Sequence, residues 1–127
     1  MEINLKINKI SFNSSQHLPK EEDIEVEIVS KFGVAKDNIL SRAFFFEINI
    51  NAVDAEGGQI SRSLILDAAF QYNLLGAKSN ASTKEDDVVY GECLKILNEK
   101  IELFTSQGQD SRQPFNIKTA IDEFESK

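Results

Sequence analysis

Residue types that carry most enzyme chemistry are scarce in this chain of 127 residues. A single cysteine, Cys93, rules out a disulfide within the chain and a zinc site built from several thiolates. It falls among apolar helix positions, where a buried structural thiol is the ordinary case. The single histidine, His17, lies in a polar stretch and gives poor support to a catalytic triad, a histidine metal site or a histidine base. We therefore expect no enzyme activity, no metal and no cofactor.

Long hydrophobic runs and an excess of positive charge are also missing. No apolar run reaches the roughly 18 residues of a membrane span, and no basic-then-apolar leader opens the chain. The net charge of −7 argues against general binding to a phosphate backbone. We expect a cytoplasmic protein with no membrane insertion and no nucleic-acid partner. The acidic balance is explained by solubility or, alternatively, by a docking surface for a basic partner.

The first half of the chain shows the alternation of apolar and polar residues that is typical of half-buried strands. Residues 3–7 alternate, and the pattern shifts by one position before Ile10 and Phe12, which a bulge or a bend near Asn8–Lys9 would explain. Residues 24–28 alternate isoleucine or valine with glutamate. They predict a second strand with a charged outer face.

Two longer strands, over residues 44–53 and 60–75, each have one almost entirely apolar face. A slip of one residue would turn every apolar side chain to the wrong face, so the loop between them must have an odd length. A three-residue turn at Gly57–Gln59 satisfies this condition and pairs Phe46 with Phe70. A five-residue loop of the same parity is also compatible, and either needs a glycine in the left-handed region.

Turn-forming residues mark the connections. We interpret residues 32–40 as a connection that packs some side chains inward, since Gly33 and Asp37-Asn38 favour turns. Residues 77–83 are small and polar and predict a loop. The glycine pair in the hairpin does not match any motif that cradles a phosphate.

Glu85–Phe104 shows the spacing of one long amphipathic helix. Ser82 is the expected N-cap, with the Glu85 side chain reaching back to it in a capping box. Gly108 is the expected stop. Thr119–Phe124 predicts a last short helix with an apolar inner face.

The apolar stripe of the long helix is unusually wide. From Leu94 to Leu103 it covers about half the circumference, whereas packing on a single surface requires ~100°. The sheet would cover one part, and a second subunit or the C-terminal segment Phe115–Phe124 would cover the rest. Lys100 falls inside the stripe, where it either extends its ammonium group outward or meets a carboxylate or ligand. The residues that we assign to an oligomer interface are Val89, Leu94, Leu97 and Ile101.

Several local features accompany this order of elements: Ile7 with Lys9-Ile10-Ser11-Phe12, the strands Phe44–Val53 and Ile60–Leu75, Leu75-Gly76, Glu92-Cys93, Gly108, and Pro114-Phe115-Asn116-Ile117. In these features the chain resembles the SecB family of export chaperones and its small bacterial relatives of unassigned role. The resemblance covers most of the chain. Residues 78–87 depart from it, because they are polar where the family has an apolar, proline-containing approach to the helix.

The resemblance implies an α+β fold: a four-stranded antiparallel sheet with one long helix packed on one face and a short C-terminal helix, forming a single domain over residues 1–127. Family members assemble as dimers of dimers through these helices, so a homo-oligomer, dimer or tetramer, is expected. They hold unfolded polypeptide in apolar grooves without ATP. The groove candidates in this chain are apolar and lie outside the helix-facing set; they are Phe32, Phe45, Ile65 and Leu75.

Three functional hypotheses follow. The first is a SecB-like holdase for unfolded or precursor polypeptides. The second is a dedicated adaptor on the same fold, for example the chaperone of one antitoxin, with no general role in secretion. The third, a small enzyme or ligand carrier, would require a deep polar pocket with converging ionisable groups.

Overall fold

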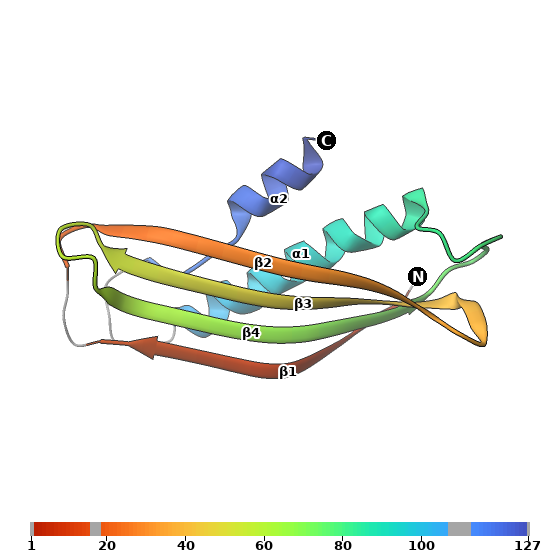
Figure 1. The fold of residues 1–127 in the computed structure, drawn as a ribbon, viewed down its shortest axis with the longest axis horizontal. Coiled ribbons are helices and arrows are strands. Elements are labelled where there is room, and N and C mark those ends of the chain that lie inside the picture. The colour runs from red at the N-terminus through yellow and green to blue at the C-terminus, as the bar shows by residue number, and fades with distance from the viewer. Residues whose placement is uncertain (1, 16–18, 107–112, 127) are drawn as a thin grey trace. The chain divides into compact units, whose positions relative to one another are not determined.

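The computed structural model describes residues 2–15, 19–106 and 113–126, which form four strands followed by two helices (Figure 1). The strands belong to one antiparallel sheet in the order β1-β4-β3-β2, so β1 and β2 form its two edges. The predicted α+β architecture, with a long and a short helix after the sheet, is confirmed. The elements are β1 (Ile3–Ser14), β2 (Glu22–Ala35), β3 (Asn38–Asp54), β4 (Ile60–Asn73), α1 (Lys84–Thr105) and α2 (Lys118–Glu125).

The chain divides into two compact units, and the strands run through both. The first unit comprises residues 1–4, 33–43 and 71–127, and the second comprises residues 5–32 and 44–70. The assignment of a single domain to residues 1–127 stays a prediction.

The second unit contains the two strands with alternating burial that the sequence predicted. Every second residue of β3 from Phe44 to Ala52 is buried, and so is every second residue of β4 from Leu64 to Phe70. Between them, Phe46 and Phe70 meet edge to face with their ring centroids 5.8 Å apart. The predicted assignment of residues to the two faces of these strands is therefore confirmed.

The loop between β3 and β4 has the longer of the two odd lengths, three and five residues, that keep the apolar faces of these strands together. β3 ends at Asp54 and β4 begins at Ile60, which leaves the five residues 55–59 rather than a three-residue turn at Gly57–Gln59. The Gly58 N–H donates to the Asp54 carbonyl at 2.8 Å, and the Asp54 N–H donates to the Gln59 carbonyl at 2.8 Å. Gly58 has a φ of 72°, the left-handed conformation that the loop was expected to require.

The interpretation of residues 32–40 as a connection is wrong. β2 continues to Ala35 and β3 already begins at Asn38, so that only Lys36 and Asp37 form the turn. Gly33 lies within β2, where a glycine is tolerated, and therefore does not mark a strand end. Likewise, β1 is continuous from Ile3 to Ser14, and its burial pattern loses the strict alternation after Leu5. The bulge or bend near Asn8–Lys9 stays a prediction.

A capping box begins α1 in the first unit, but one residue later than predicted. Thr83, not Ser82, is the N-cap: its hydroxyl accepts from the Asp86 N–H at 3.2 Å, and Asp86 Oδ2 accepts from the Thr83 N–H at 2.8 Å. Asp86 replaces Glu85 in this role because its carboxylate is also held by buried donors described below. The expected stop at Gly108 lies outside the described residues.

The segment after α1 packs back on that helix within the first unit. The Phe115 N–H donates to Thr105 Oγ1 at 2.9 Å, and the Ile117 N–H donates to Asn98 Oδ1 at 2.7 Å. These bonds lead into α2, where Phe124 lies over α1. The C-terminal segment therefore covers part of α1, which was the alternative to a second subunit.

Among the described residues, neither helix combines the length and the apolar character that a membrane span requires.

Candidate functional site

The strands of the second unit expose a face that mixes apolar and acidic side chains. We call this the open face. Part of it is an open hollow of ≈ 160 Å³, lined by Val29 and Ile65 together with carboxylates. Its outward-pointing residues on β2, β3 and β4 are Glu25, Glu27, Val29, Phe45, Glu47, Asn49, Ile65 and Asp67.

The four candidate peptide-binding residues do not share one surface. Phe45 and Ile65 lie on neighbouring strands of the open face and are 47% and 38% exposed. Phe32 points to the other side and is half-buried, with its ring 5.3 Å from that of the buried Phe44. Leu75 is 90% exposed directly after β4 in the first unit. The structure thus brings two of the four onto one face, and the peptide-binding role of all four stays a prediction.

All four residues assigned to an oligomer interface are buried in the single chain. A buried side chain offers almost no surface to a second subunit unless its helix moves. The exposed large apolar residues of α1 are instead Val88 and Leu103, and Lys100 is exposed as well. Because a single chain does not test self-association, the interface stays a prediction. The four buried residues are Val89, Leu94, Leu97 and Ile101.

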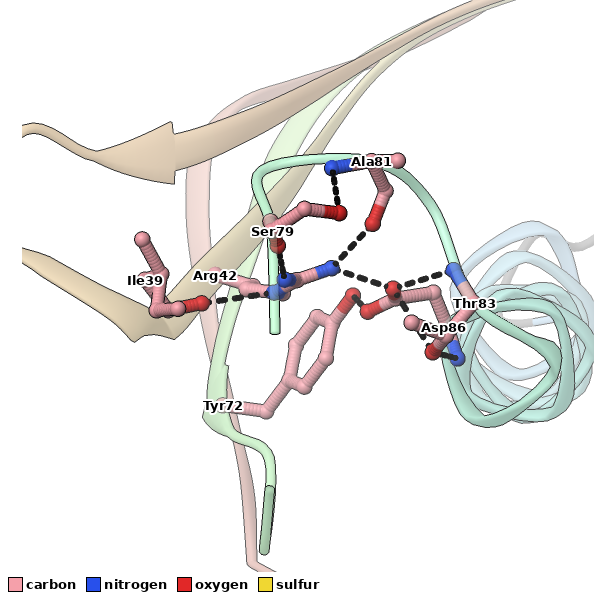
Figure 2. A network of polar contacts seen from close by, with 7 residues as sticks. All are labelled: Ile39, Arg42, Tyr72, Ser79, Ala81, Thr83 and Asp86. Carbon is pink, nitrogen blue, oxygen red and sulfur yellow. Dashed lines mark hydrogen bonds and ion pairs between the residues drawn. The ribbon is translucent and has the colours of Figure 1, made fainter. Parts of the chain in front are cut away.

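A buried ion pair in the first unit joins the start of β3 to the start of α1 (Figure 2). Arg42 Nη1 donates to Asp86 Oδ2 at 2.6 Å, and both side chains are fully buried. The remaining guanidinium donors reach backbone carbonyls: Nε donates to Ile39 at 2.9 Å, Nη1 to Ala81 at 3.0 Å and Nη2 to Ser79 at 2.8 Å. Arg42 therefore fixes the loop that leads into α1.

Asp86 accepts further hydrogen bonds on both carboxylate oxygens. The Tyr72 hydroxyl donates to Oδ1 at 2.6 Å, while the N–H and hydroxyl of Thr83 donate to Oδ2 at 2.8 and 3.0 Å. Burial alone would raise the pKa of Asp86, but these donors and the charge of Arg42 lower the pKa below its ordinary value of 3.8. Burial and the bond to Asp86 raise the pKa of Tyr72 well above its ordinary value.

This network connects β3, β4 and the start of α1. No buried side-chain nitrogen or oxygen in the described part of the chain lacks a hydrogen-bond partner. Burial raises the pKa of the Cys93 thiol to about 12, which keeps it protonated and unreactive. Within the described ranges, no group of three or more histidine, cysteine, aspartate or glutamate side chains could hold a metal ion.

Neither Arg42 nor Asp86 is among the residues that the sequence patterns single out. One signal was available: Arg42 continues the inward-facing phase of Phe44 and Phe46, and a charged residue in that phase needs a buried partner. Nothing local identified the partner, because it lies 44 residues away along the chain.

A second polar cluster fixes the beginning of the edge strand β2 in the second unit. Arg62 Nη2 on β4 lies 2.8 Å from Glu22 Oε1 on β2. The Ser61 hydroxyl donates to the other oxygen of Glu22 and also to the Ala52 carbonyl of β3, the latter at 3.1 Å. Since β3 separates β2 from β4 in the sheet, this cluster connects two strands that are not neighbours.

Comparison with known proteins shows similarity of fold. The chain is similar to a SecB-like chaperone of Mycobacterium tuberculosis in complex with a ChAD peptide from the HigA1 antitoxin, with 10% identity, a TM-score of 0.65, and coverage of 91% of this chain and 87% of that one. A protein of unknown function from Streptococcus agalactiae also matches, with 15% identity, a TM-score of 0.37, and coverage of 92% and 97%. No family model and no curated protein matches the sequence.

Proposed function

We propose that this chain is a SecB-like chaperone that binds unfolded polypeptide segments without ATP, acts in the cytoplasm as a homo-oligomer, and is not an enzyme. The observation that carries the proposal is the exposure of large apolar side chains on a sheet of this fold. One exposed apolar residue needs no explanation, whereas several on neighbouring strands are characteristic of an interaction surface. On the open face these residues are Val29 on β2, Phe45 on β3 and Ile65 on β4.

The form of the open face supports a polypeptide ligand in preference to a small molecule. Small-molecule sites enclose most of the ligand surface in a concave pocket, whereas the hollow beside Val29 and Ile65 is open. An extended chain can lie across such a face and place alternate side chains against it. Phe45 and Ile65 are the two residues of the predicted site that we place in this contact.

The proposal is tested by the aggregation of an unfolded client. The wild-type protein at molar excess should suppress light scattering from a chemically denatured client, without ATP. The double variant Phe45→Ser/Ile65→Ser should suppress it less, because contact with the client loses apolar area. Glu99→Ser, which changes an exposed residue of α1 outside every proposed contact, is the control. No suppression by the wild-type protein at any excess would contradict the proposal.

The alternative is an adaptor dedicated to one partner. It is favoured by the bound antitoxin peptide in the neighbour of similar fold. A pull-down followed by mass spectrometry separates the two: one stoichiometric protein indicates an adaptor, and many unfolded chains indicate a holdase. The outcome also bears on whether protein export is involved.

Self-association is tested by multi-angle light scattering. We expect a dimer or tetramer whose mass is constant over a wide concentration range. If Val89, Leu94, Leu97 and Ile101 formed the interface, α1 would have to change its packing on assembly, and their amides would become more protected from exchange only in the oligomer. Contact through Val88 and Leu103 would need no such change. A strictly monomeric protein would contradict this part of the proposal.

A further inference from the structure

We propose that the outer edge of β2 binds an extended client segment in which basic and apolar residues alternate. This inference rests on the proposed function and specifies the class of polypeptide that is bound. It arises from the position of β2 in the sheet, the different chemistry of its two faces, and its charge.

β2 presents an edge that is open to strand addition. It is the last strand in the sheet order, so within the described residues no strand pairs with its outer edge (Figure 1). Along such an edge, alternate residues point their backbone N–H and C=O groups outward, where the N–H donates to, and the C=O accepts from, either water or another strand. The cluster around Glu22 fixes the start of β2, and the turn at Lys36-Asp37 fixes its end. The edge is thus held in an extended form that a peptide can join.

The two faces of β2 differ in character. Glu25 and Glu27 point to the open face, and both are exposed. Strand alternation places Ile24 and Val26 on the opposite face, where they are 47% and 43% exposed. A strand added at this edge would continue both faces, with one set of its side chains beside the glutamates and the other set beside the two apolar residues.

The negative charge of the open face favours basic residues at the client positions that would lie beside Glu25 and Glu27. Glu47 on β3 and Asp67 on β4 lie with Glu27 around the hollow. None of the ion pairs between described residues involves these carboxylates or that of Glu25. Opposite charges on neighbouring strands stabilise pairing and like charges oppose it. Asp23 adds to the acidic set and Lys31 is the basic residue of the same face of β2.

The same charges disfavour pairing of β2 with β2 of a second copy in any register that places glutamates beside glutamates, although a register that sets Glu25 beside Lys31 avoids this repulsion. The basic edge strand β1 of a second copy is a more serious rival, since it carries Lys6 and Lys9. The phase of β1 shifts between these two lysines, so the alternation along β1 is interrupted even though both lysines lie off the apolar set. A regular alternating client segment fits the edge better.

The test uses three fluorescent nine-residue peptides: alternating valine and lysine, alternating valine and glutamate, and valine and lysine in two blocks. Anisotropy titrations with the wild-type protein should give about tenfold tighter binding of the first peptide than of either other, and weaker binding at high salt. Glu25→Gln/Glu27→Gln should reduce the affinity for the first peptide by about tenfold. Glu99→Gln/Glu123→Gln, with the same charge change on exposed helix residues, should change it less than about twofold.

Backbone pairing is tested with two forms of the alternating peptide that are N-methylated at alternate amides. In a strand added to an edge, one set of amides faces the edge and the other faces solvent. Methylation of one set should abolish binding and methylation of the other should leave it largely intact. Equal effects of the two sets, or equal binding of the three unmethylated peptides, would overturn the inference.

The two proposals fail in distinguishable ways. If the wild-type protein suppresses client aggregation but does not discriminate between the peptides, the client class is wrong and the chaperone function stands. If it suppresses no aggregation but binds the alternating peptide through Glu25 and Glu27, the edge site stands and the general chaperone function fails. If light scattering shows assembly that Glu25→Gln/Glu27→Gln abolishes, the edge is occupied by a second copy and the inference is overturned.

Discussion

Arg42 and Asp86 form a fully buried ion pair, with Nη1 of the guanidinium 2.6 Å from Oδ2 of the carboxylate. Placing two charges in the interior is favourable only when further hydrogen bonds satisfy both groups, and here Ile39, Ser79 and Ala81 provide acceptors for the arginine. The pair joins the first residues of α1 to β3, so the position of the helix start depends on it.

Removing one member of this pair should destabilise the protein strongly. Arg42→Met or Asp86→Leu leaves the other charge buried without its partner, which typically costs about 3–5 kcal/mol. The double variant should lose much less than the sum of the two, because neither charge then remains. Urea unfolding of the four proteins gives the coupling energy. Additive losses would show that the two side chains act independently.

The stability should fall in acid through Asp86. Because its pKa is lowered in the folded chain, the unfolded chain takes up this proton at a higher pH, and the stabilisation is lost as the pH falls from about 4 towards the folded-state pKa. Asp86→Asn lacks this proton equilibrium. The difference in unfolding free energy between wild type and Asp86→Asn should therefore shrink from pH 6 to pH 3, and a constant difference would contradict the assignment.

The position of the N-cap can be tested by a matched pair of substitutions. Thr83→Ala removes the side-chain acceptor of the Asp86 N–H and should cost about 0.5–2 kcal/mol. Ser82→Ala changes the neighbouring, exposed residue and should stay within about 0.5 kcal/mol. Thermal or urea unfolding measures both. A larger loss from Ser82→Ala would place the cap where the sequence alone predicted it.

Gly91 provides room for α2 on α1. A Cβ at this position would lie 3.0 Å from Cε1 of Phe124, whose ring also packs against Tyr90 with centroids 5.0 Å apart. Gly91→Ala should favour helix formation in α1, by up to ~1 kcal/mol, and weaken the docking of α2. Hydrogen exchange should become faster in α2 but not in α1.

The control for this substitution is Gly91→Ala/Phe124→Leu, in which the shorter side chain makes room for the new methyl group. It should restore part of the protection of α2. Unchanged exchange of α2 in Gly91→Ala would mean that Phe124 adjusts without cost.

The sequence was most informative where its apolar residues recur at a regular period. Alternation along β3 and β4 identified the buried faces, and parity limited the loop before Ile60 to an odd length. It did not separate three residues from five, because both keep the same faces together. Gly33 was misleading, since its turn preference gave no sign that the strand continued past it.

The parts that could not be predicted depend on contacts distant in sequence. Asp86 and Glu85 fit a capping box equally well, and only Arg42 and Tyr72 distinguish them. The stripe of α1 was correctly identified as apolar, but whether Leu97 is covered by its own chain or by another cannot be read from one helix. In the structure it is buried in the single chain.

The sharing of Asp86 among Arg42, Tyr72 and Thr83 also has an evolutionary consequence. These residues cannot be substituted independently, because the loss of any one side chain leaves a buried polar group of the others without its hydrogen bond. Divergent descendants should either retain the set or exchange it together for apolar residues. Such correlated replacement would identify distant homologues whose sequence identity to this chain is too low for a reliable alignment.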